Sequence, residues 1–356
     1  MRENYQSLLE KMLRKGLLLE AFPGAVAACG VADEVYALAW CGKLSLDGPD
    51  VNRETRYDVA SLTKILGPNS LALLALDAGD ITLYDTLGMY FPETPRDKKD
   101  INILQLMTHT SGIEPDHRLD KVCKDPSEVL SSILTNPLLY QVGAGPHYAC
   151  ENYMLLGRIL EKIYGSDLKT LTDEKVFQPL GMTHTGYLPQ GDNIAATEVD
   201  PVSGIAWQGV VHDENARFQG GISGNAGIFS CIDDMVIYTQ MLARNDGSFF
   251  SPAVMKKAIH NYTPGFDVHR GLGFHLAGTE CNFIGDLFPS DSFGHTGFTG
   301  TSIAVDPHTG FFVIILSNRV HPTRDNPRML KFRRQIHNAM YAEFSKQLAK
   351  ERRSPV

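Results

Sequence analysis

The segment Ala60-Ser-Leu-Thr-Lys-Ile65 begins a strongly apolar stretch that continues to Ala78, and it places a serine three residues before a lysine. Within this stretch, Leu71-Ala-Leu-Leu-Ala-Leu76 is apolar on every side of a helix, which predicts a buried helix. Pro68 lacks a backbone N–H, so we expect it to kink or reset that helix.

Ser61 and Lys64 should share one face of this helix, because residues three apart are neighbours on a helix surface. A serine becomes a good nucleophile only when a base takes its proton. A lysine can be that base only if its surroundings lower its pKa from about 10.4. The helix N-terminus adds N–H groups that favour a developing oxyanion. The pattern predicts a nucleophile and its base, although the spacing alone leaves a purely structural interpretation open.

A second Ser-x-x-Lys segment, Ser166-Asp-Leu-Lys169, directly follows Gly165. Glycine often ends a helix, so we expect a helix over 152–164 and interpret Ser166 as the N-cap of the next helix. Lys64, in contrast, would be a costly buried charge if it had no task. We therefore predict that Ser61 is the reactive serine.

Strand-like segments occur near both ends of the chain. Two β-prone runs lie at 24–31 and 35–44, and three more lie at 272–276, 302–305 and 311–317. The middle is mostly helical, with periodic segments at 103–107, 127–134, 152–164 and 233–243, and a last helix is expected over 326–350. The pattern predicts an α+β fold, an α/β sandwich in which an antiparallel sheet built from both termini is flanked by helices.

The same pattern predicts a domain division. Residues 1–66 and 268–356 would form the α/β domain that carries the sheet, and residues 67–267 would form an inserted, mostly helical domain. The length of 356 residues agrees with two structural units. We expect the active site at their interface.

Composition excludes several classes of function. The net charge is −8 and the pI is about 5.8, which argues against nucleic acid and anionic membranes as partners. No apolar run approaches a membrane helix or a secretory signal, so we expect a cytoplasmic protein. The six cysteines show no CxxC pair, which predicts free thiols and no zinc signature.

Several segments together resemble the β-lactamase-like serine hydrolases: class C β-lactamases, D-aminopeptidases, related esterases and low-molecular-mass penicillin-binding proteins. The resemblance extends from Phe22 to Pro322. The segments that carry it are Ala60–Ile65, Leu106-Met-Thr-His-Thr-Ser-Gly-Ile113, Tyr148–Glu161, Pro179-Leu-Gly-Met182, Gly294-His-Thr-Gly-Phe-Thr-Gly300, Asp306-Pro307 and Ser317-Asn-Arg319. The resemblance implies a β-lactamase/transpeptidase-like fold and a mechanism that needs neither metal nor cofactor.

Carried over by position, the resemblance implies that Ser61 is acylated and that Lys64 accepts or relays its proton. Tyr148 would be the second acid or base, and which of Lys64 and Tyr148 acts first stays open. The backbone N–H groups of Ser61 and Phe298 would form the oxyanion hole. The residues expected to contact substrate are Cys150, His295, Thr296 and Gly297.

Two positions depart from the family pattern. Cys150 stands where many relatives have asparagine, and His295 stands where they have lysine. A histidine is mostly neutral at pH 7, so it does not offer a permanent charge for a substrate carboxylate. We therefore expect hydrolysis of a small ester, amide or peptide through an acyl-enzyme, with slow or absent turnover of β-lactams.

Other functions remain open at this point. The alternatives within the family are a true class C-type β-lactamase, a D-Ala carboxypeptidase, and transfer of the acyl group to an acceptor other than water. A catalytically silent relative that binds a peptide or cell-wall fragment is the alternative of another class, although intact Ser61, Lys64 and Tyr148 argue against it. The sequence does not indicate an oligomeric state.

Two further segments have structural interpretations. Val211-His-Asp-Glu-Asn-Ala216 could in principle hold a metal, but no second histidine has ligand spacing nearby, so we favour loop capping. Thr108 and His109 should stabilise a loop through side-chain hydrogen bonds.

Overall fold

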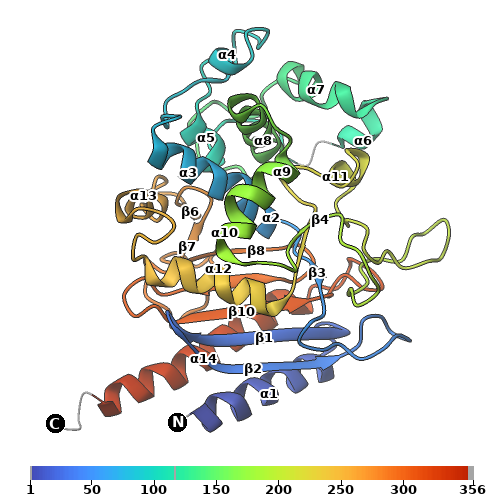
Figure 1. Cartoon of the computed structure of the whole chain (residues 1–356), viewed down its shortest axis with the longest axis vertical. Helices are drawn as coiled ribbons and strands as arrows, with labels where there is room; N and C mark the ends of the chain where they lie inside the picture. Colours follow the sequence, from blue (N-terminus) through green and yellow to red (C-terminus); the bar gives the residue numbers. More distant parts are fainter. Residues whose placement is uncertain (1, 116–117, 352–356) are drawn as a thin grey trace.

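A seven-stranded antiparallel sheet forms the base of the molecule in the computed structural model, which describes residues 2–115 and 118–351 (Figure 1). The strand order is β2-β1-β10-β9-β8-β7-β6, so strands from both ends of the chain lie side by side, as predicted. The strands are β1 (Gly24–Val31), β2 (Glu34–Gly42), β6 (His269–Arg270), β7 (His275–Leu276), β8 (Phe293–Thr296), β9 (Ser302–Val305) and β10 (Phe312–Ser317).

The interior strand β1 shows why both faces of this sheet are covered. Successive side chains of a strand point to opposite faces. In β1, Ala25, Ala27 and Cys29 pack into one apolar cluster, whereas Val26 and Ala28 pack into another. Helices α1 (Arg2–Leu18) and α14 (Arg328–Glu351) supply the first cluster. Helix α12 (Ile232–Arg244) and the helical region supply the second.

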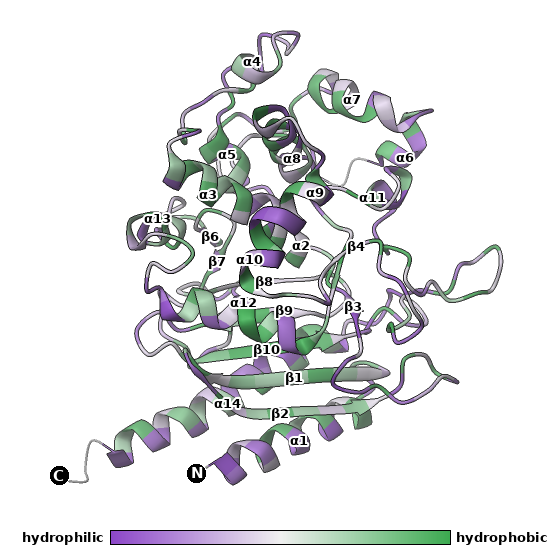
Figure 2. Ribbon diagram, in the orientation of Figure 1, coloured by the Kyte–Doolittle hydropathy of each residue, from purple (hydrophilic) through white to green (hydrophobic). Residues whose placement is uncertain are grey.

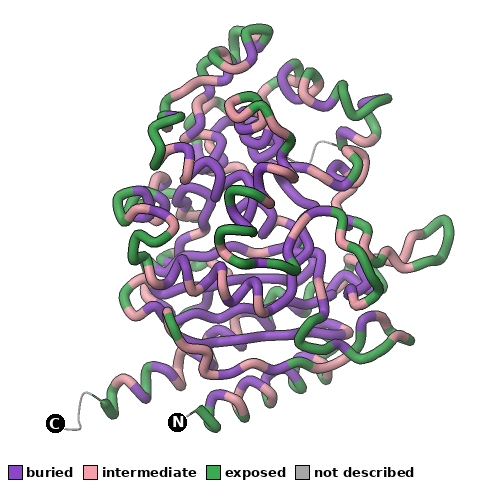
Figure 3. Tube along the Cα trace, in the orientation of Figure 1, coloured by how far each residue is buried: buried purple, intermediate pink, exposed green. Residues whose placement is uncertain are grey.

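The figures show these layers. Helices α1 and α14 lie together under the sheet, which brings the described ends of the chain near each other (Figure 1). The sheet strands β1, β2 and β10 are largely hydrophobic in colour (Figure 2). Buried residues are continuous from the sheet into the helical region, and exposed residues concentrate in the outer loops and helix ends (Figure 3).

Pro68 resets the helix that follows the nucleophile, as predicted. Helix α2 (Leu62–Lys64) passes into a π-helical turn, Ile65–Asn69, and then into α3 (Ser70–Ala78), which ends at Gly79 with φ of 79°. A π-turn accommodates the missing N–H and the ring of proline without ending the helix. The turn is entirely buried, so the sequence around Ser61 enters the core directly.

The remaining helices form the upper layer and the rims of the fold. They are α4 (Leu87–Tyr90), α5 (Ile103–Met107), α6 (Leu119–Val122), α7 (Val129–Thr135), α8 (Cys150–Tyr164), α9 (Leu168–Thr172), α10 (Gln178–Leu180), α11 (Glu214–Phe218) and α13 (Pro252–Ala258), with a 3-10 turn at Pro126–Glu128 and a second π-turn at Asp173–Phe177. No helix within 2–115 and 118–351 is long and apolar enough to cross a bilayer. All six cysteines are free, as predicted.

Several sequence predictions needed correction. A second sheet, β3-β5-β4, was not predicted, because β3 (Tyr57–Asp58), β4 (Gly186–Tyr187) and β5 (Ile228–Ser230) are too short to show alternation. Only the last two residues of the predicted strand 272–276 are strand. Gly273 has φ of 81° and bends the chain between β6 and β7. The proposed domain boundaries stay a prediction, as does the cytoplasmic location.

Candidate active site

Ser61 lies at the N-terminus of α2, on a backbone held in an unusual conformation. Ala60, directly before it, has φ of 47°, a left-handed geometry that costs free energy for a residue with a Cβ. The buried carboxylate of Asp58 supports this turn. It accepts the N–H of Ala60 at 2.8 Å and the N–H of His212 at 2.7 Å. The nucleophile is therefore held rigidly between β3 and the loop that carries His212.

Lys64 is fully buried, with 0% exposure, and its ammonium contacts the nucleophile. Its Nζ lies 3.1 Å from Ser61 Oγ, 3.0 Å from the carbonyl oxygen of Asn225 and 3.5 Å from Cys150 Sγ. It forms no ion pair with a carboxylate in the described part of the chain. The predicted pairing of Ser61 with Lys64 is thus present. Asn225 and Cys150 orient the amine toward the hydroxyl.

Tyr148 is the third member of this group. Lys64 Nζ lies 4.9 Å from the centre of its ring, and its Oη is buried without a hydrogen-bond partner among the described residues. The ring packs on His109, with ring centroids 4.3 Å apart. His109 Nδ1 accepts the N–H of Ala149 at 3.2 Å, which fixes the backbone next to Tyr148. The predicted structural role of His109 is confirmed.

The protonation states of this group depend on one another. Burial lowers the pKa of Lys64, whereas negative charge on Cys150 and Tyr148 raises it by more. Burial also raises the pKa of Cys150 to about 11 and raises that of Tyr148. Both neighbours are therefore protonated at pH 7, so their attraction for a proton on Lys64 is absent, and only the weaker attraction of Asp213 remains against burial. Burial then favours the neutral amine, which is the form that can accept a proton.

The end of β8 forms the opposite wall. His295 is buried, and burial holds its pKa well below the usual range, so the imidazole is neutral. Gly297 follows at a point of close approach, where a Cβ would lie 2.3 Å from the carbonyl oxygen of Val59. The hydroxyl of Thr301 donates to the same oxygen at 3.0 Å. These contacts hold the segment Gly294–Gly300 against the chain that leads from β3 to Ser61.

Phe298, expected to supply an oxyanion N–H, is positioned by two neighbours. Its ring is 47% exposed and stacks on His212, with centroids 5.6 Å apart at 22°. The guanidinium of Arg319 lies 4.6 Å from the ring, and its Nε donates to the Phe298 carbonyl at 2.6 Å. Arg319 holds the peptide of Phe298 from the side away from His212. Neither Arg319 nor His212 was predicted to act on this residue.

A cavity of about 210 Å³ brings these groups together. Its lining residues are Ala60, Ser61, Tyr148, Cys150, His212, Asp213, Glu214, Ala226, Phe298 and Arg324. Arg324 is already engaged by Glu198 at 2.6 Å and Glu214 at 2.8 Å. The mouth of the cavity is therefore more acidic than basic. Glu198 and Arg324 carried no recognisable sequence signal, because they are distant in sequence and meet only through the fold.

The loop 211–216 acts as a cap, as predicted. Asp213 accepts the N–H of Ala216 at 2.8 Å and begins α11. Within 2–115 and 118–351, one group could hold a metal: His184, Cys231 and Asp234, whose ligand atoms lie within 4.8 Å of one another. The Asp234 carboxylate already accepts the N–H of His184 at 2.7 Å. The group lies at the N-terminus of α12, where the helix dipole disfavours a cation, and outside the Ser61 cavity.

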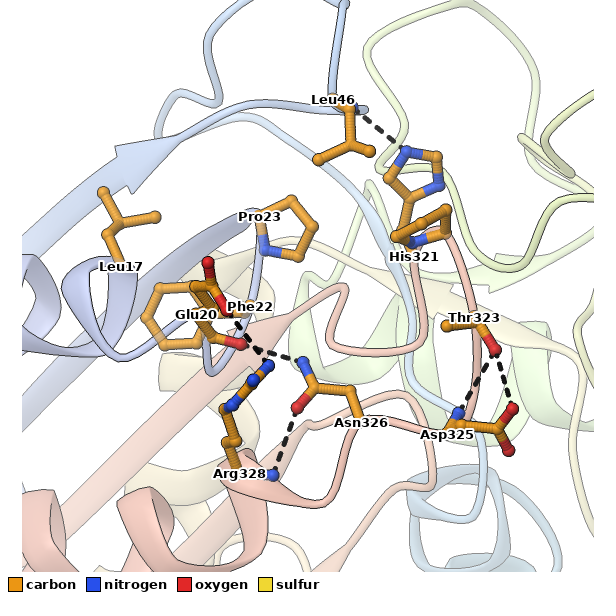
Figure 4. A pocket seen from close by; sticks show the side chains of 11 residues that line it. Leu17, Glu20, Phe22, Pro23, Leu46, His321, Thr323, Asp325, Asn326 and Arg328 are labelled. Carbon is orange, nitrogen blue, oxygen red and sulfur yellow. Dashed lines mark hydrogen bonds and ion pairs between the residues drawn. The ribbon is translucent and has the colours of Figure 1, made fainter.

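A larger cavity, about 440 Å³, lies elsewhere, between the α1–β1 turn and the chain after β10. Figure 4 shows that its polar side chains already pair: Glu20 with Arg328, and Thr323 with Asp325. His321 accepts the N–H of Leu46 at 3.0 Å. This cavity contains no nucleophile with a base. Chemistry, and not size, identifies the smaller cavity at Ser61 as the candidate active site.

One correction concerns the second Ser-x-x-Lys segment. The cap of α9 is Asp167, whose carboxylate accepts the N–H of Thr170 at 3.0 Å, and not Ser166. Lys169 points to the surface and pairs with Asp173 at 2.6 Å. A carboxylate is a stronger acceptor than a hydroxyl at a helix N-terminus. The interpretation of this segment as structural is correct, but the capping residue is one position later.

Comparisons with known proteins agree with this site. The family model described as Beta-lactamase matches residues 9–338. A protein of Escherichia coli (strain K12) named "Putative D-alanyl-D-alanine carboxypeptidase" is 31% identical over 346 residues, which cover 83% of this chain and 79% of that protein. The chain therefore belongs to the β-lactamase family. With its serine paired to a buried lysine, it is a serine hydrolase.

Solved structures support the same fold. "EstCE1, a hydrolase with promiscuous acyltransferase activity" superposes with a TM-score of 0.79 at 19% identity, over 96% of this chain and 99% of that one. The D-alanine carboxypeptidase AmpC from Burkholderia cenocepacia superposes with a TM-score of 0.75 at 18% identity, over 95% of this chain and 100% of that one. The predicted β-lactamase/transpeptidase-like fold is confirmed.

Proposed function

We propose that this protein hydrolyses small esters or amides through an acyl-enzyme on Ser61, with Lys64 and Tyr148 moving the protons. The observation that carries the proposal is the 3.1 Å contact between Nζ of the fully buried Lys64 and Oγ of the half-buried Ser61. A surface lysine would stay protonated at neutral pH and could not act as a base. The position of Tyr148 over the same amine supports its role as the second acid or base.

The acylation step follows from these positions. Ser61 Oγ forms a bond to the substrate carbonyl carbon as its proton passes to the neutral Lys64 amine. The negative charge moves to the carbonyl oxygen, which the N–H groups of Ser61 and Phe298 would stabilise. The bond to the leaving group then breaks, and the leaving group takes a proton from Tyr148. Lys64 returns its proton to Tyr148, and the acyl-enzyme remains.

Deacylation repeats the sequence with water. A water molecule gives a proton to the Lys64–Tyr148 pair and attacks the acyl carbon, and Ser61 leaves with a proton from Lys64. Another alcohol or amine could replace water, which is the acyl-transfer alternative. The hydrolase EstCE1, whose name includes promiscuous acyltransferase activity, makes that alternative worth measuring. The intact contacts among Ser61, Lys64 and Tyr148 argue against a silent binding protein.

The cavity favours substrates without a free carboxylate near the scissile bond. His295 is neutral, and Arg324, the one lysine or arginine among the described lining residues, is engaged by Glu198 and Glu214, so no free positive charge lines the cavity there. A β-lactam or a D-Ala-D-Ala peptide carries such a carboxylate. D-Ala carboxypeptidase activity is the second candidate, because the E. coli relative named for it covers 83% of this chain.

The test combines a substrate panel with active-site labelling. We expect the native protein to hydrolyse p-nitrophenyl acetate and butyrate, and to act slowly or not at all on a chromogenic cephalosporin and on a D-Ala-D-Ala peptide. A fluorophosphonate should label Ser61, located by peptide mass spectrometry. Ser61→Ala should lose labelling and turnover, and Ser166→Ala should keep both. Equal ester turnover by native and Ser61→Ala protein would refute the proposal.

Fast release of D-alanine from the peptide, dependent on Ser61, would instead support the second candidate. Rapid cephalosporin turnover would show that Cys150 and His295 do not limit β-lactam hydrolysis. Adding a primary alcohol during ester turnover separates the two fates of the acyl group. A transesterified product that exceeds free acid at low alcohol concentration would identify acyl transfer as the main reaction.

A further inference from the structure

Arg270 is a buried cation that the mechanism above does not use. It ends β6, and its backbone is held on both sides: its N–H donates to Thr263 Oγ1 at 2.9 Å, and its carbonyl accepts the N–H of Tyr262 at 2.9 Å. In the sheet, Arg270 is paired with His275, which is in turn paired with Gly294, the first residue of the segment Gly294–Gly300. The guanidinium is thus anchored two strands away from the wall of the active site.

The side chain of Arg270 has no charged hydrogen-bond or ion-pair partner in the part of the chain that the structure describes. It is 4% exposed, and neither Nε nor Nη1 has a hydrogen-bond partner among the described residues. No ion pair joins it to a carboxylate there, whereas Arg324, in the cavity wall, has two. An unpaired buried cation is destabilising, so its retention at this position requires a compensating interaction.

The compensating neighbour is Tyr148. The Arg270 guanidinium carbon lies 5.3 Å from the centre of the Tyr148 ring, within the range of a cation–π contact. Lys64 Nζ lies 4.9 Å from the same ring. Two basic side chains from different elements, Lys64 of α2 and Arg270 of β6, therefore face one phenol. A charge in this position acts more strongly on a phenolate than on a neutral phenol.

The other ionisable groups around Tyr148 do not supply a lasting positive charge. Burial is the main cause that holds the pKa values of His109, His275 and His295 well below their usual range. The charge of Arg270 adds to this effect for His109 and His275, and the charge of Lys64 adds to it for His295. Lys64 changes its charge during the reaction. Among the described residues, the ionisable groups around Tyr148 are Lys64, His109, Cys150, Tyr153, Arg270, His275 and His295. Asp213 contributes negative charge from the far side of the cavity.

We propose that Arg270 is a positioning residue whose fixed charge, acting through Tyr148, favours the phenolate each time Tyr148 gives up its proton. The inference rests on the proposed role of Tyr148. In acylation the Tyr148 Oη–H bond breaks, the proton goes to the leaving group, and the electron pair stays on Oη. Arg270 keeps its own proton throughout and stabilises that electron pair. It contacts neither substrate nor the nucleophile.

The test separates charge from structure with three variants. Arg270→Met removes the charge, Arg270→Lys keeps it, and Lys98→Met is a matched control that removes another buried cation, whose Nζ donates to the Leu134 carbonyl. The measurements are the pH dependence of kcat/KM for p-nitrophenyl acetate and of the rate of fluorophosphonate labelling of Ser61. Thermal unfolding of each variant reports the structural cost.

For Arg270→Met we expect the descending limb of both pH profiles, which reports loss of the Tyr148 proton, to move up by about one pH unit, a factor of about ten at the midpoint. KM for the neutral ester should change little, because Arg270 does not touch substrate. Arg270→Lys should stay near the native profile, and Lys98→Met should keep it even if its Tm falls. If Arg270→Met does not fold, Arg270→Gln takes its place.

An unchanged midpoint in Arg270→Met, or an equal shift in Arg270→Lys, would refute the inference, because either result means that charge is not what matters. The two proposals fail differently. Absence of Ser61-dependent labelling in the native protein would overturn the proposed function and this inference with it. Normal labelling with an unmoved profile would overturn only the role of Arg270.

Discussion

The chain contains two Ser-x-x-Lys segments with the same spacing and opposite surroundings. At the first, Lys64 is fully buried, lacks a carboxylate partner in the described part of the chain, and lies 3.1 Å from Ser61 Oγ. At the second, the Lys169 side chain is 41% exposed and pairs with Asp173. Water and a carboxylate both stabilise an ammonium, whereas burial next to neutral groups favours the amine. Spacing alone therefore does not make a base; burial does.

The largest expected effect comes from replacing the lysine of each Ser-x-x-Lys segment in turn. Lys64→Met should lower kcat/KM for p-nitrophenyl acetate by about 10³-fold, because general acid–base groups contribute roughly 10²–10⁴-fold. Lys169→Met should leave turnover unchanged and cost about 0.3–0.5 kcal/mol of stability, the usual value for an i,i+4 ion pair. Steady-state kinetics and urea unfolding measure both. Comparable loss of activity in the two variants would mean that burial does not distinguish them.

The next effect concerns the wall that faces Ser61. A Cβ added in Gly297→Ala would meet Thr301 Oγ1 at 2.0 Å and the Val59 carbonyl at 2.3 Å, so the strand must shift and carry the Phe298 N–H with it. Loss of one oxyanion donor typically costs about 10²–10³-fold in kcat. The control is Gly186→Ala, where a Cβ meets its nearest neighbour at 3.6 Å. Full activity in Gly297→Ala would argue against an oxyanion role for Phe298.

Each Ser-x-x-Lys segment has an aspartate close by, and the pKa values of these two aspartates shift in opposite directions. Burial raises the pKa of Asp58, below Ser61, to about 6. The hydrogen bond from the Thr170 N–H lowers the pKa of Asp167, beside Ser166. A raised folded-state pKa means that the folded state holds the proton more tightly than the unfolded chain. The stabilisation is complete below about pH 4 and is lost as pH rises through about 6.

Asp58→Asn removes this titration. Between pH 4 and pH 7 the native protein should lose roughly 2–3 kcal/mol of stability relative to the variant, from a pKa shift of about two units. Asp167 behaves in the opposite sense: its stabilisation is present above its unfolded pKa and is lost as pH falls. Urea unfolding of the native, Asp58→Asn and Asp167→Asn proteins across this range checks both signs. A stability difference for Asp58→Asn that does not change with pH would contradict the assignment.

The smallest expected effect concerns the residue that caps helix α9 in the second Ser-x-x-Lys segment. Asp167→Ala should cost about 1 kcal/mol at pH 7, because it removes the cap of α9. Ser166→Ala should stay within about 0.5 kcal/mol of the native protein, as surface substitutions usually do. Thermal or urea unfolding distinguishes the two. A larger loss in Ser166→Ala than in Asp167→Ala would restore Ser166 as the cap.

Much of this protein could be predicted from local sequence. The helix after Ser61, its reset at Pro68, the helix before Gly165 and the meeting of strands from both ends of the chain all follow from periodicity, proline and glycine chemistry, and strand patterning. The short strands β3 to β6 could not be predicted, because two or three residues carry no measurable alternation. The aspartate cap of α9 was missed by one position, since Ser166 and Asp167 are both good capping residues.

The sequence by itself determined which groups are chemically able to react: the Ser61–Lys64 spacing, the motif that includes Tyr148, and the substitutions Cys150 and His295. Only the tertiary structure decided the protonation states of these groups and the charges around them. The pKa of Lys64, the engagement of Arg324 by Glu198 and Glu214, and the position of Arg270 behind Tyr148 depend on contacts between residues distant in the chain. Electrostatic free energies vary with burial and with distance in space, and neither is a property of a local stretch of sequence.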